Sequence, residues 1–192
     1  RVASVYNDIG EIYSVQGDDF KALDYFKKSL KLDLSFFGEN HPSVASGYYN
    51  IGYVYFAQGD YSKALEYFEE VLKIRLSVYG ENHSQVSSIY DHIGEIYFAQ
   101  KDYSKALYYF EESLKIRLSL FGENHPEVAL SYYSIGSLYI IQGDKSKALN
   151  YYEKSLKIRL SVYGENHPLT KEIMDLINVA NSKVLQSPET TK

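Results

Sequence analysis

The side chains of this sequence that could carry chemistry form one unrepeated cluster and one repeated position. Asp91, His92 and Glu95 stand close together, and carboxylates beside an imidazole are the groups that acid–base catalysis or metal binding uses. One further residue type recurs every 42 residues, as His41, His83, His125 and His167. We interpret the cluster as ligand-contacting surface, and the recurring histidines as groups that stabilise or cap turns.

The spacing of the recurring histidines argues against a shared metal ion. If each 42-residue segment folds into two packed helices, neighbouring copies lie roughly 16–20 Å apart, whereas a metal needs its ligands about 2 Å away. A catalytic constellation is also singular, unlike a residue repeated at one position. We therefore predict no catalytic residues, no metal site and no cofactor, and hence no enzyme.

The elements that must position these side chains belong to an internal repeat. The segment GENHP occurs at 38–42, 122–126 and 164–168, with GENHS at 80–84, and residues 44–85 match residues 86–127 at 29 of 42 positions without a gap. Such self-similarity is the signature of a repeat architecture. The predicted organisation over 1–169 is four units (2–43, 44–85, 86–127 and 128–169), followed by a capping helix at 170–186 and a disordered tail at 187–192.

Each unit contains two apolar patterns of helical period. In the first unit they are Tyr6, Ile9, Gly10 and Tyr13, then Leu23, Phe26, Leu30, Leu34 and Phe37. Between them, Gly17 suits a tight turn and Asp18 suits a helix N-cap, so the pattern predicts a hairpin of two helices. Lys101 stands where the other units have glycine, and a left-handed lysine there costs on the order of 1 kcal/mol.

Composition excludes several classes of function. The 192 residues are 45% apolar and 23% charged, with a net charge of −5 and no cysteine. A net negative chain is a poor match for nucleic acid, and we find no run of membrane-spanning length and no secretory segment, so we expect no nucleic acid, no membrane and a cytoplasmic location. A row of Arg75, Arg117 and Arg159, broken by Asp33, is interpreted as pairing within helices.

The repeated residues carry a family resemblance. They are Tyr48, Ile51, Gly52, Tyr55, Ala64 and Phe68, in an order that resembles the tetratricopeptide signature. The unit is eight residues longer than the usual 34 because LKIRLSVYG (72–80) prolongs the second helix, a form similar to the repeats of kinesin light chains and their relatives. The resemblance implies an all-α, right-handed superhelical solenoid of antiparallel helical hairpins, with a concave groove that binds a protein or peptide.

The groove positions that the resemblance implies are also those at which the units differ. They are Asn7, Tyr49, Asp91 and Tyr133; Asp8, Asn50, His92 and Ser134; and Glu11, Tyr53, Glu95 and Ser137. The function predicted is therefore a protein–protein interaction scaffold. Because this set holds carboxylates and tyrosines but no lysine or arginine, we expect a basic and apolar ligand.

A self-assembling array, whose repeats stack end to end, is the alternative. The first helix of unit one, residues 2–15, has an apolar face that no preceding helix covers, and we expect a homodimer through this N-terminal repeat.

Overall fold

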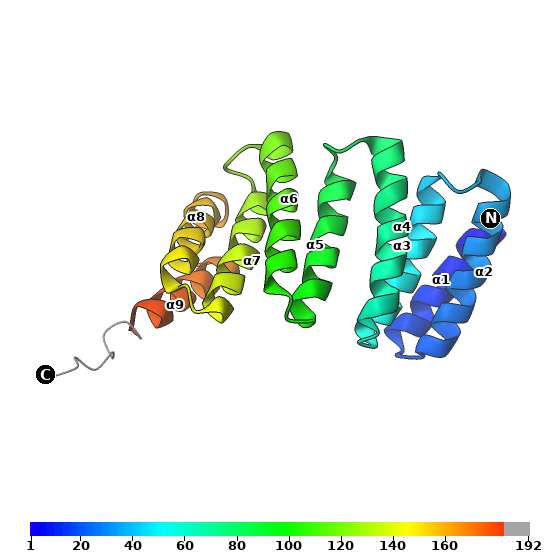
Figure 1. Cartoon of the computed structure of the whole chain (residues 1–192), viewed down its shortest axis with the longest axis horizontal. Helices are drawn as coiled ribbons and strands as arrows, with labels where there is room; N and C mark the ends of the chain where they lie inside the picture. Colours follow the sequence, from blue (N-terminus) through cyan, green and yellow to red (C-terminus); the bar gives the residue numbers. More distant parts are fainter. Residues whose placement is uncertain (183–192) are drawn as a thin grey trace, which may run out of the picture. The chain divides into compact units, whose positions relative to one another are not determined.

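The computed structural model describes residues 1–182, and all regular secondary structure in this range is α-helical, which confirms the all-α expectation (Figure 1). The helices are α1 (Val2–Val15), α2 (Asp19–Phe37), α3 (Pro42–Ala57), α4 (Tyr61–Tyr79), α5 (Ser84–Ala99), α6 (Tyr103–Phe121), α7 (Pro126–Gln142), α8 (Lys145–Tyr163) and α9 (Pro168–Ser182). The end of the predicted capping helix, 183–186, and the predicted tail, 187–192, lie outside the described residues. No helix among those described is long and apolar enough to cross a membrane.

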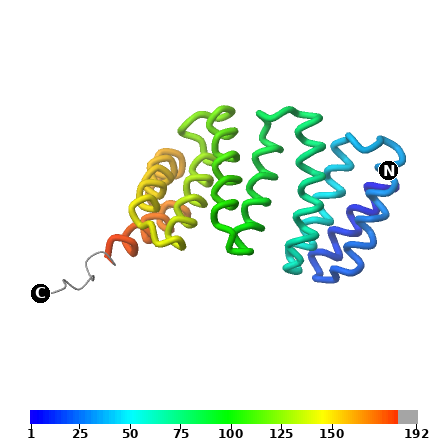
Figure 2. Tube along the Cα trace, in the orientation of Figure 1, coloured from blue at the N-terminus to red at the C-terminus, as the bar shows by residue number. Residues whose placement is uncertain are grey.

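These helices belong to two compact units, one of α1 to α5 and one of α6 to α9. In the first, α1 pairs with α2 and α3 with α4, while α3 also packs on α2 and α5 packs on α4. In the second, α7 pairs with α8, α6 packs on α7, and α9 packs on α8. Figure 2 shows that, within each unit, the chain reverses direction at every short connection, so successive helices are antiparallel.

Tight turns join the two helices of a hairpin. Gly17, Gly59 and Gly143 have φ of 77°, 77° and 83°, in the left-handed region that glycine adopts at little cost. After the first of these turns, Asp18 caps α2 by accepting a hydrogen bond from the backbone N–H of Lys21 at 3.2 Å. Lys101 takes the same left-handed backbone, with φ of 63°, as its place in the repeat predicts.

The recurring histidines cap the helices that follow the longer connections. His41 Nδ1 accepts a hydrogen bond from the backbone N–H of Ser43 at 3.1 Å, and its ring stacks on Phe37 with centroids 4.0 Å apart. The same pair of contacts occurs at His83, His125 and His167. The predicted capping role is confirmed. Within the described residues, no group of three or more His, Asp or Glu side chains is arranged to hold a metal ion.

Small residues allow the two helices of a hairpin to approach closely. A Cβ added to Gly52 of α3 would lie 3.0 Å from the ring of Phe68 on α4, and Phe68 is only 1% exposed. Ala64, one turn before Phe68, is fully buried. The rings of Tyr48 and Tyr55 flank this contact by packing on Tyr67, with centroids 6.0 and 5.6 Å away. The predicted core is thus the interface between the first and second helices.

Replacing Lys101 with glycine removes the left-handed strain and should raise the free energy of unfolding by about 0.5–1 kcal/mol. Urea unfolding followed by circular dichroism measures this change. The matched control is Gln100→Gly, because the adjacent Gln100 has a right-handed φ of −75° and gains nothing from glycine. Equal effects of the two substitutions would contradict the prediction.

Candidate functional site

Polar side chains of α1 and α3 bond to one another along the face predicted to form the groove. The amide nitrogen of Asn50 donates to the amide oxygen of Asn7 at 2.7 Å, and Asn7 donates in turn to a carboxylate oxygen of Glu11, also at 2.7 Å. These contacts hold the carboxylate of Glu11 beside α3. Asp8, the next residue on α1, is exposed.

A second set of contacts joins α3 to α5. The hydroxyl of Tyr49 lies 2.9 Å from Nε2 of His92, and Nδ1 of His92 lies 3.2 Å from a carboxylate oxygen of Glu95. Both rings pack against Phe68, with centroids 5.7 and 5.6 Å from it. Asp91 is half-buried beside His92 on α5. The unrepeated polar cluster is therefore tied to α3 through Tyr49.

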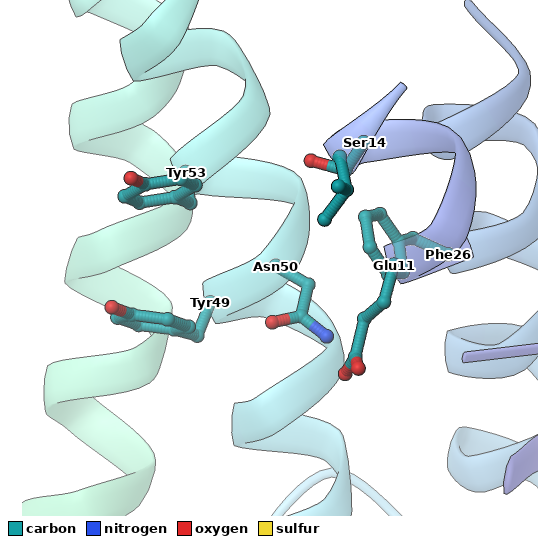
Figure 3. Close-up of a pocket in the computed structure, with 7 residues that line it drawn as sticks. Glu11, Ser14, Phe26, Tyr49, Asn50 and Tyr53 are labelled. Carbon is teal, nitrogen blue, oxygen red and sulfur yellow. The ribbon is translucent and has the colours of Figure 1, made fainter. Parts of the chain in front are cut away.

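A pocket of about 280 Å³ opens between α1 and α3. Figure 3 shows Glu11 and Asn50 reaching toward the same space, with the rings of Tyr49 and Tyr53 one above the other along α3. Those two rings are nearly parallel, with centroids 6.3 Å apart. The full lining is Glu11, Ser14, Val15, Phe26, Tyr49, Asn50 and Tyr53. The pocket thus combines an exposed carboxylate with apolar and aromatic walls.

Sequence reasoning missed three of the residues that line this pocket. Ser14 and Val15 lie one helical turn beyond Glu11, and the spacing of three and four residues could have identified them. Phe26 comes from α2, and it reaches the pocket because Gly10 leaves room: an added Cβ there would lie 2.6 Å from its ring. The pairing of a helix glycine with an aromatic residue 16 positions later was the available signal.

The three remaining predicted residues lie on α7, in the second unit. The hydroxyl of Tyr133 donates to a carboxylate oxygen of Glu172 on α9 at 3.0 Å. Ser137 bonds to the backbone oxygen of Tyr133 at 3.0 Å and lies 3.1 Å from the hydroxyl of Tyr152. Ser134 is half-buried.

The arginine row behaves differently from the expectation of pairing within helices. Arg117 of α6 contacts Glu127 of α7 at 3.0 Å, and Arg159 of α8 contacts Glu172 of α9 at 3.5 Å. These ion pairs join different helices, because each arginine points toward the helix that follows its own. The interpretation as pairing within helices is therefore wrong for these two residues.

Burial raises the pKa of several tyrosines in both units, Tyr49 and Tyr133 among them, and the hydrogen bond to Glu172 adds to the effect at Tyr133. Unfolded tyrosines ionise near pH 10. Above that pH the unfolded chain has lost protons that the folded chain retains, so the free energy of unfolding falls as the pH rises.

We expect a steeper loss of stability above about pH 10 in the wild type than in a Tyr49→Phe, Tyr133→Phe double variant, because the variant lacks two of the responsible groups. Chemical unfolding at a series of pH values measures the slope. Parallel curves for the two proteins above pH 10 would contradict this explanation.

The chain matches the profile of the Tetratricopeptide repeat family over residues 1–77, 44–119 and 85–161. No curated protein matches it. Among solved structures it is similar to BtubC (BKLC) from P. vanneervenii, with 25% identity and a TM-score of 0.77, over 86% of this chain and 66% of that one. A putative kinesin light chain with nearly identical TPR-like repeats from Podosopora anserina shows 16% identity and a TM-score of 0.74, over 96% and 97%. The apo form of RapI shows 20% identity and a TM-score of 0.80, over 95% and 64%.

The chain therefore spans a little under two-thirds of the length of BtubC and of RapI. These structures share the stacked helical hairpins described above, and the profile covers most of the sequence. The family is typically one of non-enzymatic scaffolds. The chain belongs to the tetratricopeptide repeat family and has the TPR-like solenoid fold of a protein-interaction scaffold.

Proposed function

We propose that the face formed by α1, α3 and α5 binds a peptide segment of a partner protein that carries lysine or arginine among apolar residues. The observation that carries this proposal is the pocket between α1 and α3, which Glu11 and Phe26 line together with the nearly parallel rings of Tyr49 and Tyr53. A cationic side chain with an apolar stem fits such a pocket through charge pairing and contact with an aromatic face.

The charge of this face supports a basic ligand. Asp8, Glu11, Asp91 and Glu95 are its acidic residues, and the carboxylates of Glu11 and Glu95 contact Asn7 and His92 respectively. Carboxylates positioned by neighbours lose less side-chain freedom when a cation binds than freely rotating ones do.

Variation between the repeats also supports recognition at these positions. The buried Ile51 and Gly52 recur in the units, whereas the neighbouring face carries Tyr49, Asn50 and Tyr53 in one copy and different residues in the others. We propose that Tyr133, Ser134 and Ser137 form the corresponding contact face of the second unit.

A peptide array probed with the intact chain tests this function. We expect peptides of net positive charge with apolar residues to bind best, and their affinity to fall as salt is added. The Glu11→Gln, Glu95→Gln variant should bind them about tenfold more weakly, since two charge pairs of up to about 1 kcal/mol each are lost.

The matched control is Glu69→Gln with Glu111→Gln, which removes the same charge from exposed positions on α4 and α6. This control should bind as the wild type does. A preference for peptides of net negative charge would contradict the assignment of the face.

Self-assembly is a second candidate, and a specific observation favours it. Val2 and Ile12 of α1 are 60% and 55% exposed, whereas Val44 and Val54, 42 residues later on α3, are 0% and 2% exposed because α2 covers them. Phe36 at the end of α2 is 85% exposed and lines a cavity of about 430 Å³ with Val2. We propose that a second copy covers this apolar face in a closed dimer, since on α9 the exposed Asn178 and Asn181 flank the exposed Val179 and interrupt its apolar surface.

Val5 and Ile9 lie on α1, and Val5 is 52% exposed. Sedimentation equilibrium of the chain and of a Val5→Glu, Ile9→Lys variant therefore distinguishes the two candidates. The wild type should dimerise with increasing concentration, and the variant should remain monomeric while still binding the peptides that the wild type selects. A wild type that stays monomeric at high concentration would rule out the dimer and leave the peptide-binding proposal standing.

A further inference from the structure

The C-terminal helix supplies a carboxylate to a site built by α7 and α8. Arg159 of α8 donates to the backbone oxygen of Leu169 at 2.6 Å and lies 3.5 Å from one carboxylate oxygen of Glu172. Tyr133 donates its hydroxyl proton to the other oxygen at 3.0 Å, and the Arg159 guanidinium lies over the Tyr133 ring at 4.9 Å. One carboxylate is therefore held by an arginine and a tyrosine together.

Helices α3, α4 and α5 repeat this arrangement 84 residues earlier in the chain, without the carboxylate. Arg75 donates to the backbone oxygen of Gln85 at 2.8 Å and lies over the ring of Tyr49 at 5.6 Å. The residue in the position of Glu172 is Ser88 of α5, whose short hydroxyl bonds to the backbone oxygen of Ser84 at 2.9 Å. The arginine and the tyrosine are thus in place, and the acidic side chain between them is missing.

Arg75 lacks the carboxylate partner that the other two arginines of its row have. Arg117 and Arg159 each have a carboxylate partner, and the residue that corresponds to Glu127 near Arg75 is the uncharged Gln85. Within the described residues, no carboxylate oxygen lies within 4.0 Å of the Arg75 guanidinium, which is half-buried. Burial lowers the pKa of Arg75, as expected of a cation that has lost water without gaining an anion.

We propose that Arg75 and Tyr49 form a receptor site for a single carboxylate group of the bound peptide. To bind the carboxylate, Tyr49 turns its hydroxyl proton away from His92, and Nε2 of His92 donates to the phenol oxygen instead; Nδ1 of a neutral imidazole then carries no proton and releases Glu95. Tyr49 also lines the pocket that contains Glu11. The inference therefore rests on the proposed function and sharpens it: the peptide carries a basic side chain toward Glu11 and an acidic one toward Arg75.

A substitution that supplies the missing carboxylate from within the chain tests the site without any ligand. Ser88→Glu should pair with Arg75 as Glu172 pairs with Arg159, and should raise the melting temperature by about 3–12 °C, the range expected for a hydrogen bond to a charged group in a chain of this size. The gain should vanish when Arg75→Met is combined with it. The neutral variant Ser88→Gln controls for the size of the side chain.

The repeat offers a matched control of opposite sign. Ser46 occupies the same position on α3, but the residue that corresponds to Arg75 there is Asp33, and Ser46 and Asp33 line one cavity. Ser46→Glu places two carboxylates together and should lower the melting temperature. If Ser88→Glu behaves like Ser88→Gln or like Ser46→Glu, the site does not hold a carboxylate and the inference is overturned.

Peptide binding tests the same Arg75–Tyr49 site with a carboxylate that the ligand supplies. In a set of lysine-containing peptides scanned with Glu against Gln at each position, the wild type should prefer Glu about tenfold at one position. Arg75→Met and Ser88→Glu should each abolish that preference and keep the preference for lysine. Equal binding of Glu and Gln peptides would refute the site alone, whereas loss of all peptide binding would refute the proposed function and leave the melting experiment to decide the site.

Discussion

In the hairpins of α1 with α2, α3 with α4 and α7 with α8, a glycine of the first helix lies in close contact with an aromatic ring of the second helix. This contact underlies both the fold and the proposed binding face. A Cβ at Gly10, Gly52 or Gly136 would lie 2.6, 3.0 or 2.7 Å from the ring of Phe26, Phe68 or Tyr152. The close approach of the two helices at these points requires glycine, because a larger residue would push the two backbones apart.

The same rings build the floor of the candidate site. Phe26 lines the pocket together with Glu11, Phe68 packs against Tyr49 and His92, and the hydroxyl of Tyr152 lies 3.1 Å from Ser137. The buried rings therefore serve the packing of these hairpins and also position the side chains that differ between repeats. This explains how the repeats can change their outer side chains freely while the surface that carries them keeps its shape.

The fold could be predicted from the sequence because its signals are local and repeated. Helical spacing, the turn at Lys101 and the caps at residues such as His41 each involve residues close in the chain, and four copies reinforce one another. The helix positions of the candidate site followed from the same register, combined with the family resemblance. The contacts between them did not, because Asn7 with Asn50 and Tyr49 with His92 each join residues 43 apart, on helices whose relative offset only packing determines. The pairing of Arg159 with Glu172 was missed for the same reason.

Each described helix packs mainly on the helices next to it in the chain: α2 on α1 and α3, and α8 on α7 and α9. Such a chain has no single interface whose loss would release all of its parts, since stability is distributed over successive neighbours. Its mechanical behaviour follows. Under tension the hairpins should come apart one after another, each releasing 42 residues of chain, or about 140 Å of extended backbone, so the chain would lengthen in steps rather than rupture in one event.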